Sequence, residues 1–393
     1  MLTAAEIIAK AEVKAGFRDT ETGLHENLAA LVAAIDSGPA LSATGLASVE
    51  NGLVTRSAER IEGLKWVHEY PEIADEQIAA PVILTGLPRS GTTYLQYLFD
   101  RDDRFRLIRT WEALAPMPPP GFDPASVAQR KAQESAVRAR SRPAVANFSA
   151  LHLHDDDGSE ECHAFLEQGY AAAGFFNLYD VPDFFDFLMD EVDLDAVYAV
   201  HRRQLQLLQW KSSPRRWALK YPNHVIALEA LERTYPGARF VMTHRDPVQL
   251  LASISKMTLA LRSARYAQPV DPHKVGRQMT LFVRRHIDRI LAHARSAAGE
   301  RVTHVDYYRL QADAAGVIGE VHERLGLDTP DRVGSAIASW HRDNPKNARG
   351  ANDYALEQFG IDAGEVTDLF SDYISHFDIP SEREGLARAG VSA

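Results

Sequence analysis

The sequence predicts an α/β fold in which helices cover both faces of a central parallel sheet. Two observations support this prediction. Short apolar runs bounded by Pro or Gly, typical of buried parallel strands, alternate with segments of helical periodicity. The first 80 or so residues carry only the helical pattern. The chain has 393 residues, 45% of them apolar and 25% charged, which suits one large α/β domain with insertions or two smaller domains.

Composition limits the classes of function. A net charge of −11 argues against a nucleic-acid partner, so an anionic small ligand needs a local basic patch. Cys162 is the single cysteine and can form no intramolecular disulfide, which fits a cytoplasmic protein. The N-terminus mixes Glu and Lys into its apolar residues, as an amphipathic helix does and a signal peptide does not. No stretch approaches the roughly 18 apolar residues of a membrane span, and no heptad pattern indicates an oligomeric state.

The elements follow in order along the chain. Residues 1–80 are predicted to form a helical segment, and residues 81–393 the α/β domain. "PVILTG" is expected to be its first strand, with a helix from about Thr92. The proline-rich stretch "APMPPPGFDP", Ala115 to Pro124, favours a loop or linker. Helices and an acidic, aromatic insertion are expected over about residues 113–200.

A second alternation of strands and helices begins after this insertion. "RWALKYP", "ARFVMTHRD" and "RVTHVDYY" are predicted strands. "NHVIALEALERTYPG" is a predicted helix with Asn223 as its N-cap and Gly237 as its stop. "PVQLLASISKM" is a predicted helix with Pro247 at its first position. Strands that alternate with helices indicate a parallel, three-layer sheet domain.

The turn after the first strand, "GLPRSGTT", resembles a phosphate-binding loop, which makes the predicted core P-loop-type. Gly86 and Gly91 allow the backbone to approach a ligand, and the following helix directs free N–H groups at an anion. Where a nucleotide triphosphatase has lysine, this chain has Thr92, and its basic residue, Arg89, lies inside the turn. The loop therefore suits a smaller anion that needs no metal ion. A glycine turn without a ligand is the less favoured alternative.

A second anion site is predicted after a later strand. Arg245 stands at the end of "FVMTHRD", and Ser253 follows eight residues on. Ligands bind beyond the carboxyl ends of parallel strands, so Arg89 and Arg245 should border the same edge. Two anion sites at one edge suit a nucleotide with phosphates at two positions. An ordinary ion pair from Arg245 to Asp246 or another carboxylate is the alternative.

Together these motifs resemble the family of sulfotransferases that use 3′-phosphoadenosine 5′-phosphosulfate, most closely its bacterial members, over about residues 80–377. The resemblance implies that "GLPRSGTT" holds the 5′-phosphosulfate and that Arg245 and Ser253 hold the 3′-phosphate. "HVDYYRL" is similar to a tyrosine-containing strand near the donor, with Tyr307 or Tyr308 in that place. "NPKNARGANDY" is a loose match to a late loop over the 3′-phosphate. The implied donor-binding residues are Arg89, Ser90, Gly91, Thr92, Thr93, Arg245, Ser253, Tyr307, Lys346, Arg349 and Gly350.

Transfer of a sulfonate to an alcohol needs a base for the hydroxyl and cations for the departing phosphate. The resemblance places Glu112 as the base, just past the phosphate-loop helix, and Lys220 near the sulfonate, with Arg89 as a further cation. His224 is the rival base. An ordinary ion pair for Glu112, and a polar position in a helix's first turn for His224, are the alternatives without catalytic meaning.

The segment "LHLHDDDGSEECHAFLEQ" holds acidic residues and histidines, but its spacing matches no calcium or zinc signature. We expect a solvated acidic loop and no metal. A third interpretation keeps Glu160 or Glu161 as a carboxylate that contacts substrate. The aromatic stretch "GFFNLYDVPDFFDFLMDE" would line an apolar pocket or, more commonly, pack in the core. The possible metal ligands in the first segment are His152, His154, Asp155, Asp157, Glu161 and His163.

The sequence therefore predicts a cytoplasmic sulfotransferase. It would move a sulfonate from 3′-phosphoadenosine 5′-phosphosulfate to a hydroxyl of a small, partly apolar acceptor. A P-loop kinase or NTPase is the first alternative, and the missing loop lysine weighs against it. A nucleotide-binding protein without catalytic activity is the second.

Overall fold

A five-stranded parallel sheet forms the centre of the protein, in the order β2-β3-β1-β4-β5. The computed structural model describes residues 1–141, 157–344 and 356–390. The sheet confirms the predicted fold class and its four predicted strands, except that the fourth ends at Asp306 and the two tyrosines predicted in it begin a helix. β2 was not predicted, because two residues are too short to show a period. The strands are β1 (Val82–Gly86), β2 (Phe105–Arg106), β3 (Arg216–Lys220), β4 (Arg239–His244) and β5 (Val302–Asp306).

Both faces of this sheet are buried, which is why its strands read as continuous apolar runs. Ile83 of β1 joins one large apolar cluster, whereas its neighbours Val82 and Leu84 join another. In the same way, Phe240 and Val241 of β4 belong to opposite clusters. Successive side chains of a strand point to opposite faces, so the sheet is the middle of three layers.

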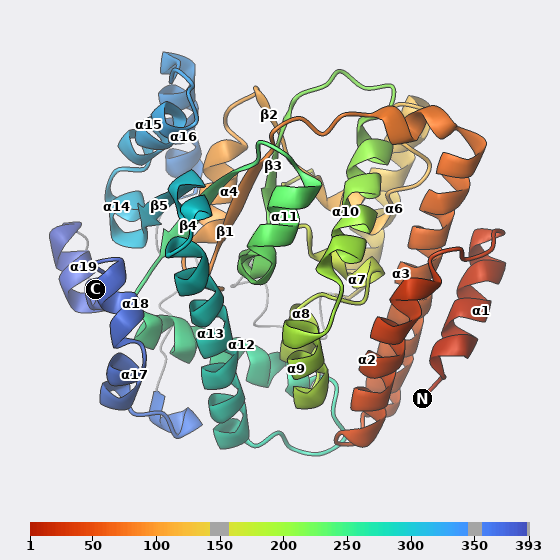
Figure 1. Cartoon of the computed structure of the whole chain (residues 1–393), viewed down its shortest axis with the longest axis horizontal. Coiled ribbons are helices and arrows are strands. Elements are labelled where there is room, and N and C mark those ends of the chain that lie inside the picture. The colour runs from red at the N-terminus through yellow and green to blue at the C-terminus, as the bar shows by residue number, and fades with distance from the viewer. Residues whose placement is uncertain (142–156, 345–355, 391–393) are drawn as a thin grey trace.

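Helices α1 (Ala4–Ala15), α2 (His25–Ser37) and α3 (Ala43–Glu69) make up most of the N-terminal region, as predicted, with 3₁₀ turns at Thr22–Leu24 and Pro71–Asp75. They lie at one side of the molecule, in red and orange in Figure 1. The buried apolar residues of α2, and several of those of α1 and α3, belong to the same cluster as Ile83 of the sheet, whereas the others of α1 and α3 form a small cluster of their own. A boundary near residue 80 therefore stays a prediction.

Of the remaining helices, two begin where they were predicted, α4 at Thr92 and α12 at Pro247. The Asp246 side chain caps α12 by accepting a hydrogen bond from the N–H of Val248. None of the helices in the described ranges is long and apolar enough to cross a membrane. These helices are α4 (Thr92–Phe99), α5 (Thr110–Leu114), α6 (Val127–Ser141), α7 (His163–Gln168), α8 (Gly174–Leu178), α9 (Pro182–Asp190), α10 (Leu194–Gln209), α11 (Leu228–Thr234), α12 (Pro247–Ser263), α13 (Pro272–Ala294), α14 (Tyr307–Ala312), α15 (Ala314–Arg324), α16 (Asp331–Asp343), α17 (Ala363–Leu369), α18 (Ser371–His376) and α19 (Glu382–Arg388).

The segment after β3 differs from its prediction. A 3₁₀ helix covers Pro222–Ala227 before α11 begins, and Asn223 lies inside it rather than at an N-cap. The Asn223 side chain is instead hydrogen-bonded to Nε2 of His286, 3.0 Å away. A proline one residue before Asn223 favours this tight turn. Gly237, with a φ of +83°, follows the end of α11, in agreement with its predicted role as a stop.

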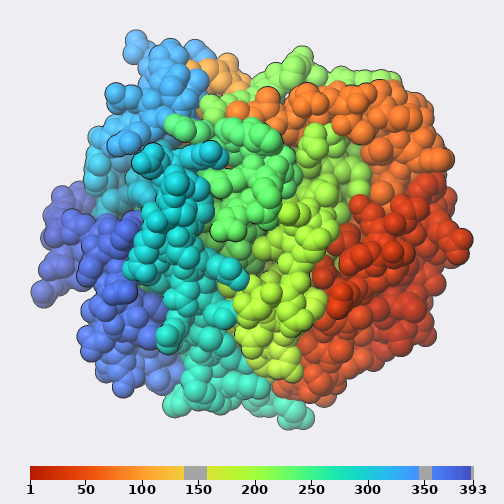
Figure 2. Space-filling model, in the orientation of Figure 1, coloured from red at the N-terminus to blue at the C-terminus, as the bar shows by residue number. Residues whose placement is uncertain are grey.

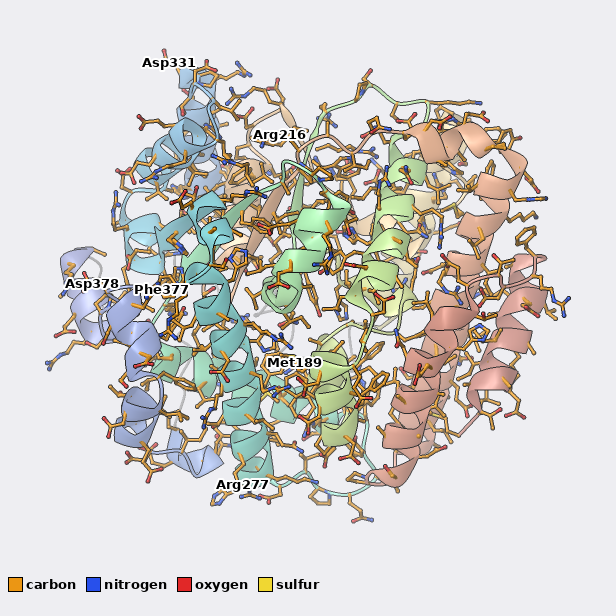
Figure 3. All side chains as sticks on the ribbon, viewed as in Figure 1. Met189, Arg216, Arg277, Asp331, Phe377 and Asp378 are labelled. Atoms are coloured by element: carbon orange, nitrogen blue, oxygen red, sulfur yellow. The ribbon has the colours of Figure 1, made fainter. Side chains whose placement is uncertain are left out.

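The C-terminal helices cover the β4–β5 side of the sheet. Figure 2 shows them, in blue, on the side of the molecule opposite the N-terminal helices. In Figure 3, Phe377 lies with these helices, whereas Arg216, where β3 begins, lies near the top of the view. The ring of Phe377 stacks on His244 at the end of β4, with 4.1 Å between centroids. The chain's last helices are therefore anchored to the sheet edge that carries Arg245.

Candidate active site

A cavity of about 640 Å³ lies at the carboxyl ends of the strands. Its walls include residues that end four strands or follow them within three residues: Arg89 after β1, Lys220 at the end of β3, Arg245 after β4 and Tyr307 after β5. Parallel strands end at one edge of a sheet, so these residues, far apart in the chain, converge. Of the predicted site residues, the cavity is lined by Arg89, Gly91, Thr92, Thr93, Lys220, Arg245 and Tyr307.

The loop after β1 is held tightly against its neighbours. Gly91 has a φ of +96°, and a Cβ there would lie 2.7 Å from the Tyr307 ring. Ser90 is fully buried, and its hydroxyl bonds Leu87 O and Thr243 Oγ1, each at 2.6 Å. Ser90 therefore fastens the loop to β4 and does not face the cavity. A side chain larger than the hydrogen atom of glycine would not fit at Gly91. The cavity wall at this position is therefore formed by backbone atoms.

Arg89 joins the two predicted anion sites. Its φ of +74° is unusual for a residue with a side chain and is the kind of strain that occurs at ligand-binding loops. Its Nε donates to Oγ of Ser253 at 3.0 Å, and its carbonyl accepts from Nη1 of Arg245 at 3.3 Å. Ser253 is buried and does not border the cavity itself. It contacts the site through Arg89.

The first turn of α4 offers an anion its N–H groups and two hydroxyls. Gly91 is the N-cap and supplies no side-chain acceptor to this helix. Thr92 and Thr93 border the cavity, and Oγ1 of Thr93 accepts a hydrogen bond of 3.0 Å from Nζ of Lys220. A helix N-terminus with uncapped amides and a nearby ammonium group suits a phosphate or sulfate ligand.

Lys220 also forms an ion pair with Glu161. The backbone places this carboxylate, because Glu160 N donates to Ile108 O and Cys162 N donates to Lys220 O, each at 2.8 Å. Glu160 and Glu161 both line the cavity. The interpretation of this segment as one that presents a carboxylate to the site agrees with this placement. The histidines and aspartate at 152, 154 and 155 lie outside the described residues.

His163 borders the cavity next to this segment. Its Nε2 lies 3.1 Å from a carboxylate oxygen of Glu167, which also accepts a hydrogen bond from Arg56. Burial would raise the pKa of Glu167, but His163 and Arg56 outweigh it and lower that pKa to about 2. His163 is therefore held by an ion pair of its own.

Arg245 pairs with Glu382 of α19, with 2.5 Å between Nη2 and Oε1. Burial would lower the pKa of Arg245, but its hydrogen bonds to Glu382 raise it above the ordinary value. The guanidinium carbon also lies 4.2 Å from the centre of the Tyr307 ring. Tyr308 instead donates its hydroxyl proton to Glu382 at 2.7 Å. Of the two adjacent tyrosines, Tyr307 is thus the one at the cavity.

Glu112 lies away from the cavity. Its two carboxylate oxygens accept hydrogen bonds of 2.9 Å from Arg106 and from the backbone N–H of Arg109, and only 4% of the residue is exposed. Glu112 is the third residue of α5, so its side chain folds back to cap its own helix. This placement corresponds to the ordinary ion pair named as the alternative.

His224 is fully buried and does not line the cavity. Its Nδ1 shares a 2.6 Å hydrogen bond with the hydroxyl of Tyr198. Burial, with smaller contributions from His201 and Lys220, lowers the pKa of His224 well below its usual value, so the ring is neutral. Neither proposed base therefore reaches the cavity in this conformation. Lys346, Arg349 and Gly350 lie outside the described residues.

An aromatic wall completes the cavity, and sequence reasoning missed most of it. Tyr94 and Tyr97 project from α4, and Trp340 and His341 from α16. Both tyrosine rings lie 5.8 Å from the Trp340 ring. The sequence offered one signal for Trp340 and His341, because "SWHRDN" stands just before the predicted late loop of the donor site. Met257 and Leu261 of α12 add apolar surface.

Known proteins resemble this chain in sequence and fold. The family model described as "Sulfotransferase family" matches residues 81–331. The structure of sulfotransferase STF9 from Mycobacterium avium has a TM-score of 0.89 at 24% identity, over 97% of this chain and 98% of that one. Sulfotransferase STF1 from Mycobacterium tuberculosis has a TM-score of 0.82 at 27% identity, over 94% and 99%. No protein with a curated description matches the chain.

The family match covers well over half of the residues and includes the loop after β1, Lys220 and Arg245. The strands and helices that carry these residues have the same arrangement in the two mycobacterial sulfotransferases. The chain therefore belongs to the sulfotransferase family.

Proposed function

We propose that the protein transfers a sulfonate group from 3′-phosphoadenosine 5′-phosphosulfate to a hydroxyl of a small, partly apolar acceptor. The observation that carries this proposal is the convergence of the lysine-free loop, Lys220 and Arg245 on one cavity. Three cationic side chains and a helix N-terminus around one space suit a ligand with anionic groups at two ends. The single cysteine supports a cytoplasmic location.

The donor would supply an activated sulfonate, and this chain's residues would bind it and stabilise the charge that develops. Thr92, Thr93 and the amides of the first turn of α4 would hold the 5′-phosphosulfate. Arg245 would hold the 3′-phosphate, with Ser253 acting through its bond to Arg89. Lys346, Arg349 and Gly350 remain the proposed residues of the late loop.

Lys220 and Arg89 would stabilise the negative charge left on the donor phosphate as the sulfonate departs. Lys220 is well suited because its ammonium group already donates to Thr93 in the first turn of α4. Its side chain is otherwise buried, so water screens its charge little. Removal of this one cation would therefore affect the reaction more than removal of an exposed one.

We assign the role of general base to Glu161 rather than to Glu112 or His224. Glu161 borders the cavity and is paired with Lys220, which holds its carboxylate at the wall. A hydroxyl of the acceptor placed against this wall would pass its proton to a Glu161 oxygen as its own oxygen attacks sulfur. Glu112 and His224 keep the role only if the chain rearranges on binding.

The acceptor would lie along the aromatic wall. Tyr97, Trp340, Met257 and Leu261 offer rings and aliphatic carbon to an apolar skeleton. Pockets of this kind orient a ligand by a few polar groups and bind the rest by contact with apolar surface. A partly apolar alcohol or phenol suits such a wall better than a free sugar does.

Calorimetric titration tests the donor class without knowledge of the acceptor. We expect adenosine 3′,5′-bisphosphate to bind at least tenfold more tightly than ATP with Mg²⁺, because only the first presents a 3′-phosphate to Arg245. Tighter binding of MgATP would favour a kinase or NTPase. The bisphosphate could also bind while no member of a broad panel of alcohols and phenols accepts a sulfonate. That result would favour a nucleotide-binding protein without catalysis.

A further inference from the structure

A second cluster of chemically reactive side chains lies in the core behind the cavity. It consists of Cys162 before α7, His201 in α10 and His224 in the 3₁₀ helix after β3. All three residues are fully buried. The sulfur and one ring nitrogen of each histidine lie within 4.8 Å of one another. None of these atoms has a role in the sulfotransferase site proposed above.

The hydrogen bonds of the two histidines leave the same atom free in each. Nδ1 of His201 shares a 2.5 Å hydrogen bond with the hydroxyl of Tyr235, and Nδ1 of His224 shares a 2.6 Å bond with that of Tyr198. The Nε2 atoms of both rings are buried and have no hydrogen-bond partner in the described structure. Burial of one polar atom without a partner is costly, and here two histidines that each carry such an atom lie beside one thiol.

This arrangement is typical of a metal site. Histidines that bind a metal through one nitrogen almost always have the other held by a hydrogen bond, which fixes the ring. Here Tyr198 and Tyr235 hold the two Nδ1 atoms. A thiolate and two neutral imidazoles are ligands that Zn²⁺ prefers, at about 2.3 Å to sulfur and about 2.0–2.1 Å to nitrogen.

We propose that Cys162, His201 and His224 bind one Zn²⁺ ion in the protein core. The Cys162 thiol would lose its proton to solvent as the ion enters during folding, and the S–Zn bond would replace the S–H bond. The three side chains need only draw slightly closer than they lie now. A water molecule would complete the tetrahedral coordination. These three residues do not line the donor-binding cavity, and the proposal does not rest on the function proposed for it.

The ion would hold the wall of the active-site cavity in place. Cys162 directly follows Glu161, and His224 lies four residues after Lys220. The backbone N–H of Cys162 already donates to the carbonyl of Lys220 at 2.8 Å. One ion bound to both segments and to α10 would therefore fix the backbone from which Glu161 and Lys220 project. Its role is positioning, and it takes no part in the chemistry.

Metal analysis of the full chain tests this proposal. The protein is expressed in zinc-supplemented medium, freed of any affinity tag and dialysed, because a site filled during folding exchanges slowly afterwards. We expect about one Zn²⁺ per chain, less than a fifth of that in Cys162→Ala and in His201→Phe, and the full amount in His322→Gln. His322 is a matched control, since it is also buried but lies on α15 beside a different apolar cluster.

Expression in cobalt-supplemented medium gives an independent measurement. Cys162 is the single cysteine, so a thiolate-to-cobalt charge-transfer band can arise from no other residue. We expect this band, together with the visible bands of tetrahedral cobalt, in the wild-type protein, even if the substituted chains fail to fold. No band and less than a tenth of an equivalent of zinc would overturn the proposal and leave a buried water as the occupant. Zinc retained in both variants would overturn it as well.

Discussion

Glu112 and Glu161 are both glutamates paired with a buried cation, yet they lie in different surroundings. Glu112 has both oxygens bound within its own helix region, by Arg106 and by the N–H of Arg109. Glu161 pairs with Lys220 at the wall of the cavity, and 19% of its side chain is exposed. The comparison shows that a short distance in sequence from the phosphate loop does not place a side chain at the site. Proximity to the carboxyl end of a strand does.

The difference arises from the backbone. Glu112 is at the third position of a short helix, where a glutamate reaches back to the N-cap. Glu161 lies between two residues whose backbone N–H groups are hydrogen-bonded to Ile108 and Lys220, and its side chain pairs with Lys220 at the cavity wall. The predictions below separate the two carboxylates by their effects on turnover, stability and binding.

The largest expected effect is on turnover. Glu161→Gln keeps the shape of the side chain and removes the proton acceptor, so turnover should fall by roughly 10²–10⁴-fold. Binding of adenosine 3′,5′-bisphosphate should change by less than about threefold, because the phosphate-binding groups remain. Steady-state kinetics with any acceptor found in the panel, and calorimetry, make these measurements.

Glu112→Gln is the matched control for this experiment, and folded protein should keep near-normal turnover. The assignment of the base would be contradicted if Glu112→Gln lost turnover and Glu161→Gln kept it. A loss seen in His224→Asn but not in Cys162→Ala, in protein that still binds the bisphosphate, would move the base to His224, because both variants remove a proposed zinc ligand and only the first removes this imidazole.

The next effect is on stability. Here the substitution of Glu112 should have a larger effect than the substitution of Glu161. Glu112→Gln leaves the Arg106 guanidinium buried without its carboxylate, which should lower the free energy of unfolding by on the order of 3 kcal/mol. Glu161→Gln should cost clearly less, because 19% of the Glu161 side chain is exposed and Oγ1 of Thr93 still accepts a hydrogen bond from the Lys220 ammonium group. Urea unfolding followed by circular dichroism measures both. Equal losses would show that burial does not distinguish the two ion pairs.

Substitution of Arg245 tests the end of the cavity that is proposed to hold the 3′-phosphate. Its expected effect is on binding and is smaller than the effects above. Arg245→Ala should weaken adenosine 3′,5′-bisphosphate by roughly 2 kcal/mol, about 30-fold, through loss of a charge-assisted contact. Binding of AMP, which has no 3′-phosphate, should hardly change. A matched control is Glu382→Gln, which removes the protein's own partner of Arg245 and should not weaken the bisphosphate. Equal losses for both nucleotides would show that Arg245 has only a structural role.

The smallest expected effect is that of chelation. Affinity for adenosine 3′,5′-bisphosphate should be the same with and without EDTA, because the proposed donor site uses Arg89, Lys220 and Arg245 where triphosphatases use lysine and Mg²⁺. A core zinc ion, being fully buried, would survive brief exposure to the chelator. A tenfold loss of affinity, about 1.4 kcal/mol, would contradict the metal-free donor site.

Several elements were predictable because their signals are local. The buried strands, the helix that begins at Thr92 and the one that begins at Pro247 follow from apolar runs, glycine spacing and proline at a first turn. The convergence of Arg89 and Arg245 followed from a general property of parallel sheets rather than from any one residue. The family followed from the same motifs and is confirmed by the match over residues 81–331.

By itself, the sequence determined four of the five strands, the helices that begin at Thr92 and Pro247, the family and the loop that lacks a lysine. Only the tertiary structure decided which carboxylate faces the cavity, which tyrosine lies beside Arg245 and which aromatic rings form the far wall. These features depend on side-chain directions and on contacts between residues far apart in the chain, such as Arg245 with Glu382 and Cys162 with His201. Local periodicity specifies which face of an element is apolar, but three-dimensional packing selects the partner that each polar group meets.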